Sequence, residues 1–166
     1  QVATNTVTSP VASVTLTGID SDDVYLLTIV GASASLDNDQ LRFRYTESGT
    51  PNITANYDYA YKAMRSGSTA FSNLSSTNLD HGRISWLGEA DDEYALVGMH
   101  YIYNANNSSE YTFMTVEQCN GYYISAELLG FQGGNVFTVT SAVNGIQLYY
   151  AGSNLSAGTF TLYKVI

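Results

Sequence analysis

The two histidines, His81 and His100, are the first side chains to consider for catalysis. Imidazole exchanges a proton near neutral pH, and a serine hydrolase pairs it with a hydroxyl and a carboxylate. Asp80, His81 and Ser85 offer these three groups close together in the chain. However, no glycine-flanked serine turn of the kind that exposes a hydrolase nucleophile accompanies them. We therefore expect His81 to be a polar turn residue and His100 a strand residue.

The single cysteine, Cys119, directly precedes Asn120-Gly121. A catalytic thiol needs a nearby base and an electropositive environment. Neither is indicated in a chain with 6 Lys and Arg against 15 Asp and Glu. One cysteine also excludes an intrachain disulfide and a cysteine-cluster metal site. We expect a small, half-buried side chain at the end of a strand.

Three dense acidic turns could supply oxygen ligands for Ca²⁺: Asp20–Asp23, Asp37–Asp39 and Glu89–Glu93. They lack the loop glycine and the closing glutamate of an EF-hand. Acidic residues also occupy solvated turns through turn propensity alone. We expect no metal and no cofactor, and with no catalytic motif evident we predict that the protein is not an enzyme. Paired carboxylates of a glycosidase are recognised by geometry, so a secreted hydrolase of β fold stays open as an alternative.

Tyrosine is abundant, with 14 residues, and five are candidates for an interface or a ligand-stacking surface: Tyr57, Tyr59, Tyr61, Tyr122 and Tyr149. The first three share one face of a predicted strand, and the last two are each followed by a second tyrosine. Tyrosine is favoured where one end of the ring is dry and the other is wet. The alternative is that these rings cover the faces of a sheet, and both readings stay open.

Charge and composition exclude several classes of protein. The chain has 166 residues and a formal net charge of −9, which repels phosphate and argues against a nucleic-acid binder. A hydrophobic fraction of 45% argues against disorder, and no apolar run is long enough to span a bilayer. The composition does not shift along the chain. We therefore expect a single domain over residues 1–166, with no membrane contact.

Short runs of strand-like sequence recur throughout. Val11–Thr17, Leu41–Thr46 and Tyr57–Lys62 alternate apolar and polar residues with period 2, which is typical of half-buried strands. Val24–Val30 and Tyr94–Tyr103 are apolar on both parities, which suits strands covered on both faces. The sequence predicts an all-β fold, an antiparallel β-sandwich of jelly-roll type with about ten or eleven strands.

Glycine and asparagine mark the expected connections. Asn120-Gly121 and Asn144-Gly145 predict tight hairpins, and Gly130–Asn135 predicts a loop. Ser66–Asp80 could be an extended loop or a short helix. The residues expected to be mostly buried are Val14, Leu16, Leu26, Ile29, Phe43, Leu96, Met99, Phe113, Val116, Phe137, Leu148, Phe160 and Leu162.

Three segments carry a family resemblance: Ser13–Asp20 (SVTLTGID), Leu41–Thr46 (LRFRYT) and Ala157–Tyr163 (AGTFTLY). Their order resembles that in small virion proteins of tailed phages, especially phages of marine and cyanobacterial hosts. Those chains open with a strand leading into a Gly-Ile-Asp-type turn and end with a Gly-Thr-(Phe/Ile)-x-Leu-Tyr-Gly strand. Lys164 stands where the closing glycine would be. The resemblance covers nearly the whole chain, and its motifs are structural.

The resemblance implies a non-enzymatic structural protein on the exterior of the virion, assembled in the bacterial cytoplasm. A capsid decoration (cement) protein is favoured, because the chain is short and lacks a coiled-coil or repetitive shaft. Its partners would be the major capsid protein or other virion proteins, and it would form a homo-oligomer, with a trimer as the first expectation. The alternatives are a tail-fibre or tail-tip receptor-binding module and a carbohydrate-binding module, either of which could contact a host-surface glycan. An exposed aromatic platform would distinguish a carbohydrate-binding module, and convergent carboxylates in a cleft would distinguish a hydrolase.

Overall fold

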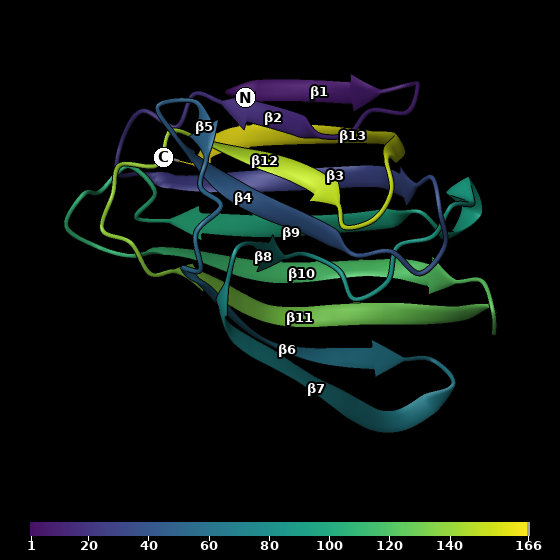
Figure 1. Ribbon diagram of the computed structural model, residues 1–166. Coiled ribbons are helices and arrows are strands. Elements are labelled where there is room, and N and C mark those ends of the chain that lie inside the picture. The colour runs from purple at the N-terminus through teal and green to yellow at the C-terminus, as the bar shows by residue number, and fades with distance from the viewer. Residues whose placement is uncertain (166) are drawn as a thin grey trace.

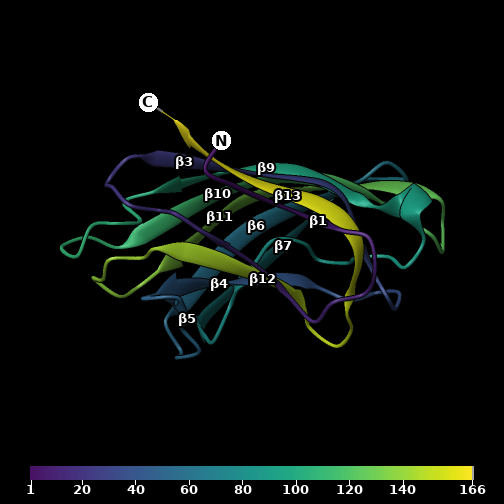
Figure 2. The same ribbon diagram turned by 90° about the horizontal axis from the view of Figure 1, so that it is seen from above.

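Two antiparallel β-sheets pack face to face in the computed structural model, which describes residues 1–165 (Figures 1 and 2). The larger sheet has eight strands, in the spatial order β1 (Ala3–Val7), β13 (Leu155–Val165), β3 (Val24–Ala34), β9 (Leu96–Tyr103), β10 (Thr112–Tyr122), β11 (Glu127–Phe137), β6 (Tyr57–Arg65) and β7 (Ser68–Leu79). The smaller sheet consists of β2 (Val14–Thr17), β12 (Gly145–Tyr150), β4 (Leu41–Glu47) and β5 (Thr50–Pro51), with β8 (Gly82–Arg83) also paired to β4. Within residues 1–165 the only helix is a single 3₁₀ turn, Asp92–Tyr94. The predicted all-β sandwich is confirmed.

The smaller sheet covers one face of the larger sheet only. Figure 2 shows β4, β5 and β12 on one side of the layer that contains β3, β9 and β13, with no strand on the other side. In Figure 1 the hairpin of β6 and β7 extends beyond the smaller sheet. The larger sheet therefore has an inner face, packed against the smaller sheet, and an outer face that no described element covers.

The core lies between the sheets and is rich in aromatic rings. Phe43 and Tyr45 of the smaller sheet meet Tyr57 and Phe137 of the larger one, with ring centroids 5.8 to 6.4 Å apart. Aromatic pairs at this spacing each add about 0.5–1.5 kcal/mol beyond the burial of their area. The expected core residues that are buried are Val14, Leu16, Ile29, Phe43, Leu96, Val116, Phe137, Leu148, Phe160 and Leu162.

Three expected core residues point the other way. Leu26 is only half-buried, while Met99 and Phe113 are exposed on the outer face, so these predictions were wrong. Their neighbours Leu27 and Met114 point inward instead. Because β3 and β9 carry apolar side chains on both parities, the sequence does not reveal which parity faces the core. The expectation that these strands are covered on both faces is also wrong.

The connections differ from the sequence prediction around β10 and β11. Asn120 and Gly121 continue β10, and the turn lies beyond Tyr122, which pairs with Glu127. The segment Gly130–Asn135, predicted as a loop, belongs to β11. The longer ladder completes more main-chain hydrogen bonds and buries Leu129 and Phe131. These gains outweigh the low strand propensity of the glycines.

Two further segments differ from what the sequence suggested. Ser66–Asp80, which could have been an extended loop or a short helix, contains β7, an edge strand with mostly exposed, polar side chains. Asn144-Gly145 does not form a hairpin, because β11 and β12 belong to different sheets. It connects the sheets instead, and the Asn144 main-chain N–H donates to the carbonyl of Thr46 at 2.9 Å.

Candidate functional site

The outer face of the larger sheet is the most unusual surface of the molecule because it is largely apolar. Val30 is 60% exposed, Met99 53% and Phe113 46%. Other exposed apolar side chains on this face are Val97, Tyr101, Tyr163 and Val165. Contiguous apolar surface of this kind marks binding sites in soluble proteins.

The alternation of β9 shows how the sequence builds this face. Leu96, His100 and Ile102 point into the core, while Val97, Met99 and Tyr101 point outward. A sheet face that meets water would carry polar residues at the outward positions. The apolar residues on both parities therefore give β9 one buried apolar face and one exposed apolar face.

The outer face is stepped, because tall side chains on β9 and β10 adjoin a low strip on β11 and β6. Gly134 of β11, which has no side chain, lies directly opposite Ala60 of β6, whose side chain is a single methyl group. A hollow of about 890 Å³ lies over this strip, bounded by Tyr103 and Phe113 on one side and the serines of β7 on the other. A second hollow of about 660 Å³ lies over Gly130, beside Met99.

A row of polar side chains separates the two hollows. Glu117 of β10 lies opposite Gln132 of β11, which in turn lies opposite Lys62 of β6. Within residues 1–165 neither Glu117 nor Lys62 forms an ion pair. The Lys62 ammonium instead lies 5.2 Å from the ring centroid of Phe71 on β7.

Most of the acidic side chains lie away from the outer face, in the turns. Within Asp20–Asp23, Lys164 approaches Asp23 at 2.8 Å and Asp20 at 3.8 Å. The hydrogen bond from Tyr25 holds the pKa of Asp20 below its usual value, and Lys164 does the same for Asp23. Residues 1–165 contain no group of three or more acidic, histidine or cysteine side chains placed to hold a metal ion.

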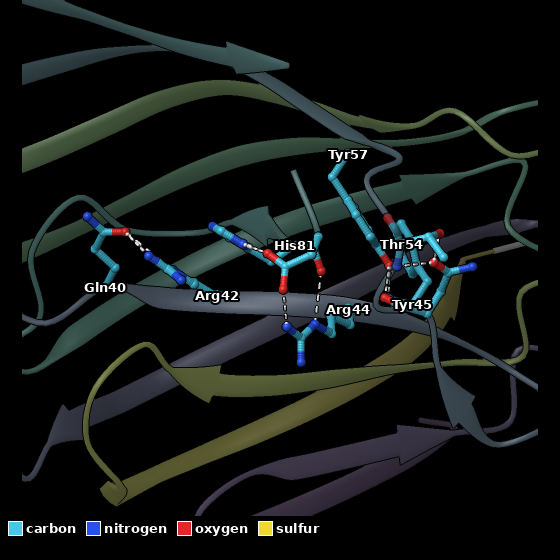
Figure 3. A network of polar contacts seen from close by, with 9 residues as sticks. Gln40, Arg42, Arg44, Tyr45, Thr54, Tyr57 and His81 are labelled. Carbon is cyan, nitrogen blue, oxygen red and sulfur yellow. Dashed lines mark hydrogen bonds and ion pairs between the residues drawn. The ribbon is translucent and has the colours of Figure 1, made fainter. Parts of the chain in front are cut away.

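Asp80 and His81 do contact each other, but the role of their contacts is structural. Nδ1 of His81 lies 2.7 Å from Oδ1 of Asp80, and the Arg44 guanidinium on β4 binds the other carboxylate oxygen at 2.5 Å (Figure 3). Burial lowers the pKa of His81. The Ser85 hydroxyl accepts a hydrogen bond from the Leu41 main-chain N–H at 3.0 Å, and no hydrogen bond in residues 1–165 joins it to His81. Because no serine hydroxyl is hydrogen-bonded to the His81 imidazole in residues 1–165, Asp80 and His81 lack the geometry of a catalytic triad.

Tyr57 and Tyr61 are buried in the sandwich and Tyr59 is half-buried. In Figure 3 the Tyr57 ring points toward Tyr45, whose main-chain N–H donates to the Tyr57 hydroxyl at 2.9 Å. The Tyr61 ring stacks on Tyr59 at 5.0 Å. An interface or ligand role for Tyr57 and Tyr61 does not fit these positions, because their rings are buried between the sheets.

Tyr122 and Tyr149 are both half-buried beneath arginine side chains. The Arg65 guanidinium lies 5.1 Å from the Tyr122 ring centroid, and that of Arg44 lies 4.8 Å from the Tyr149 ring centroid. The tyrosines of the outer face are different ones: Tyr101, Tyr103 and Tyr163. The signal that could have located them was the apolar character of Tyr94–Tyr103 on both parities.

The remaining two candidates lie on opposite faces of the larger sheet. His100 is fully buried, its ring nitrogens have no hydrogen-bond partner in the described chain, and burial lowers its pKa to about 3. Cys119 is half-buried and lies opposite Gly130 at the second hollow. Residues 1–165 therefore give the His100 imidazole no hydrogen-bond partner for acid–base chemistry.

Comparisons of the chain with protein families, with curated sequences and with solved structures found no match. Within residues 1–165, no helix has the length and apolar character needed to cross a membrane.

Proposed function

We propose that this protein is a non-enzymatic structural component of the surface of a phage particle, and that it works by protein–protein contact. The observation that carries the proposal is the uncovered, largely apolar outer face of the eight-stranded sheet. Exposed Val30, Met99 and Phe113 would lose contact with water in an assembly. Burial of such side chains stabilises association by about 25 cal/mol per Å² of apolar area.

The place of the protein on a phage particle rests on the resemblance of three segments to virion proteins: Ser13–Asp20, which contains β2, Leu41–Thr46 in β4 and Ala157–Tyr163 in β13. The preformed sheet face suits contact with another protein, because binding between preformed surfaces avoids the cost of ordering a flexible chain. A decoration protein of the capsid is the favoured form, with the major capsid protein as its partner. A tail-fibre or tail-tip module would use the same face against another virion protein.

The test is binding to particles assembled without this protein. Purified protein is mixed with such particles and sedimented, and bound protein is quantified. We expect saturable binding, which Val30→Lys on β3 weakens at least about tenfold, because a lysine at the contact must be desolvated. Ile53→Lys is the matched control, since Ile53 is 65% exposed but lies outside the outer face, between β5 and β6. Absence of binding to heads and tails alike would contradict the proposal.

A carbohydrate-binding module is the second candidate, favoured by the hollow beside Tyr103 and Phe113. One wall of this hollow is aromatic, and the opposite wall carries Asp58, Ser75 and Thr77. Sugar rings could stack on the first wall and hydrogen-bond to the second. Retention on immobilised neutral glycans, abolished by Phe113→Ala, would favour this function over assembly.

A further inference from the structure

We propose that the outer face binds the outer face of a second copy of this chain, related by a two-fold axis that runs parallel to β11. This inference names a partner for the surface on which the proposed function rests. It concerns the five strands β9, β10, β11, β6 and β7, with β11 in the middle. A two-fold interface requires a surface that is complementary to itself, and this is the commonest symmetry of soluble oligomers.

The charges on the face are self-complementary about Gln132. Glu117 and Lys62 lie on either side of Gln132, one strand away in each direction. A two-fold axis along β11 places Glu117 over Lys62 of the partner subunit and Lys62 over Glu117 of the partner subunit. Gln132 meets its own copy near the axis. Two ion pairs thus form from residues that have no oppositely charged partner within the described chain.

The tall and short side chains of the face are also complementary about this axis. The axis sets β10 over the partner's β6 and β9 over the partner's β7. Tyr101, which lies in one row with Thr115, Gly134 and Ala60, then meets the low surface at Ser75 of the partner subunit. Phe113 lies in the row of Val136 and Asp58 and is placed over Asp58 of the partner subunit. The larger hollow, about 890 Å³ in one copy, is the space that these side chains would enter. Packing of two sheet faces in this way is the arrangement of β-sandwich cores.

The distribution of charge permits contact between two copies that each carry −9. Of the 15 acidic residues, only Asp58 and Glu117 lie on this part of the outer face. Five strands are about 24 Å wide, and eight residues are about 26 Å long. Each copy would contribute about 600 Å², which brings the total to the lower end of the range for specific interfaces.

The interface leaves β3 and β13 outside it. Val30 and Tyr163 stay exposed in the pair, beside the five central strands. They are then available for contact with the particle. The geometry of this face favours a pair over the trimer that the resemblance led us to expect.

Charge reversal tests the inference by analytical ultracentrifugation over a range of protein concentrations at low salt. Wild-type protein is expected to dimerise. Glu117→Lys and Lys62→Glu should each raise the dissociation constant at least about tenfold, because like charges then face each other twice. The double variant Glu117→Lys/Lys62→Glu should restore dimerisation to within about threefold of wild type, since it recreates both ion pairs with exchanged signs. Circular dichroism of each variant verifies folding.

Glu110→Lys is the matched control, because Glu110 is exposed in the loop between β9 and β10. It should leave dimerisation unchanged. A wild-type protein that stays monomeric at about 100 μM would overturn the inference, as would a double variant no better than the single ones. A monomer whose Tyr103 and Phe113 amide signals shift with a neutral oligosaccharide would assign the face to a glycan instead. Sedimentation of the monomeric variants with particles still tests the proposed function separately, through Val30 on β3.

Discussion

The side-chain amide of Asn135 on β11 forms hydrogen bonds to both main-chain groups of Arg83 on β8. Its Oδ1 accepts from the Arg83 N–H at 2.9 Å, and its Nδ2 donates to the Arg83 carbonyl at 3.0 Å. The Tyr61 hydroxyl donates to the same carbonyl. The Asn135 amide of the larger sheet thus satisfies main-chain groups of β8, which lies at an edge of the smaller sheet and has no neighbouring strand there to satisfy them.

Asn135→Ala should lower the free energy of unfolding by about 1–3 kcal/mol. The substitution leaves the Arg83 N–H buried without an acceptor, while the Arg83 carbonyl keeps the Tyr61 hydroxyl. Urea denaturation at pH 7 measures the change. Asn73→Ala on the exposed edge strand β7 is the matched control and should have little effect. Equal stability of the two variants would show that the Asn135 contact does not hold the sheets together.

Phe160→Ala should cost about 3–5 kcal/mol, the usual penalty for removing a buried aromatic ring. Phe160 is fully buried on β13, where it lies between Asn5 of β1 and Ile29 of β3. Tyr163→Ala on the outer face of the same strand is the control, and we expect a change below about 1 kcal/mol. An unchanged unfolding midpoint for Phe160→Ala would contradict the placement of β13 in the core.

The sequence predicted the fold class because period-2 alternation survives in most strands. Phe43 and Phe160 were placed in the core correctly, since polar residues flank them on the other parity. Met99 and Phe113 were not, because β9 is apolar on both parities and the residues next to Phe113 do not mark its face. Which face meets the smaller sheet depends on long-range pairing. The glycines of β11 led to the wrong prediction of a loop for a similar reason. Their close approach to β6 is visible only once the strands are paired.

The candidate site was only partly predictable for the same reason. Tyrosine was recognised as a contact residue, but Tyr57 and Tyr61 fill the core and Tyr101 and Tyr103 line the outer face. The row Glu117–Gln132–Lys62 arises because the consecutive strands β10 and β11 pair in register with β6, which lies far earlier in the sequence. No local pattern specifies such a register. The sequence could predict a sheet with two apolar faces, but not the polar row that crosses one of them.

His100 should make the protein less stable in acid. Its folded-state pKa of about 3 lies below the unfolded value near 6.5, because burial disfavours the charged imidazolium. The unfolded state therefore binds an extra proton as the pH falls from 6.5 toward 3, and the free energy of unfolding decreases by up to about 1.4 kcal/mol per pH unit. His100→Leu should remove this dependence. Urea denaturation of wild type and variant at pH 7, 5 and 4 gives the difference, and a difference that is constant with pH would contradict the assignment.

Glu89 should have the opposite dependence on pH. Its side chain is 1% exposed, both carboxylate oxygens have no hydrogen-bond partner in the described chain, and burial followed by the charge of Asp37 raises its pKa to about 7. Because the folded-state pKa lies above the unfolded value near 4.5, folding favours the protonated form. Its contribution to stability is fully present below pH 4.5 and is lost as the pH rises through 7.

Glu89→Gln keeps the shape and the hydrogen-bonding capacity of the protonated side chain but cannot ionise. We expect it to be close to wild type at pH 4.5 and more stable than wild type at pH 8, where wild type must bury a carboxylate or shift it toward water. Glu110→Gln in the exposed loop between β9 and β10 is the control and should change stability little at either pH. Thermal unfolding at the two pH values distinguishes the outcomes. A Glu89→Gln variant that is destabilised equally at pH 4.5 and pH 8 would mean that the carboxyl group has a partner in solution and is not held as an uncompensated acid between β8 and β9.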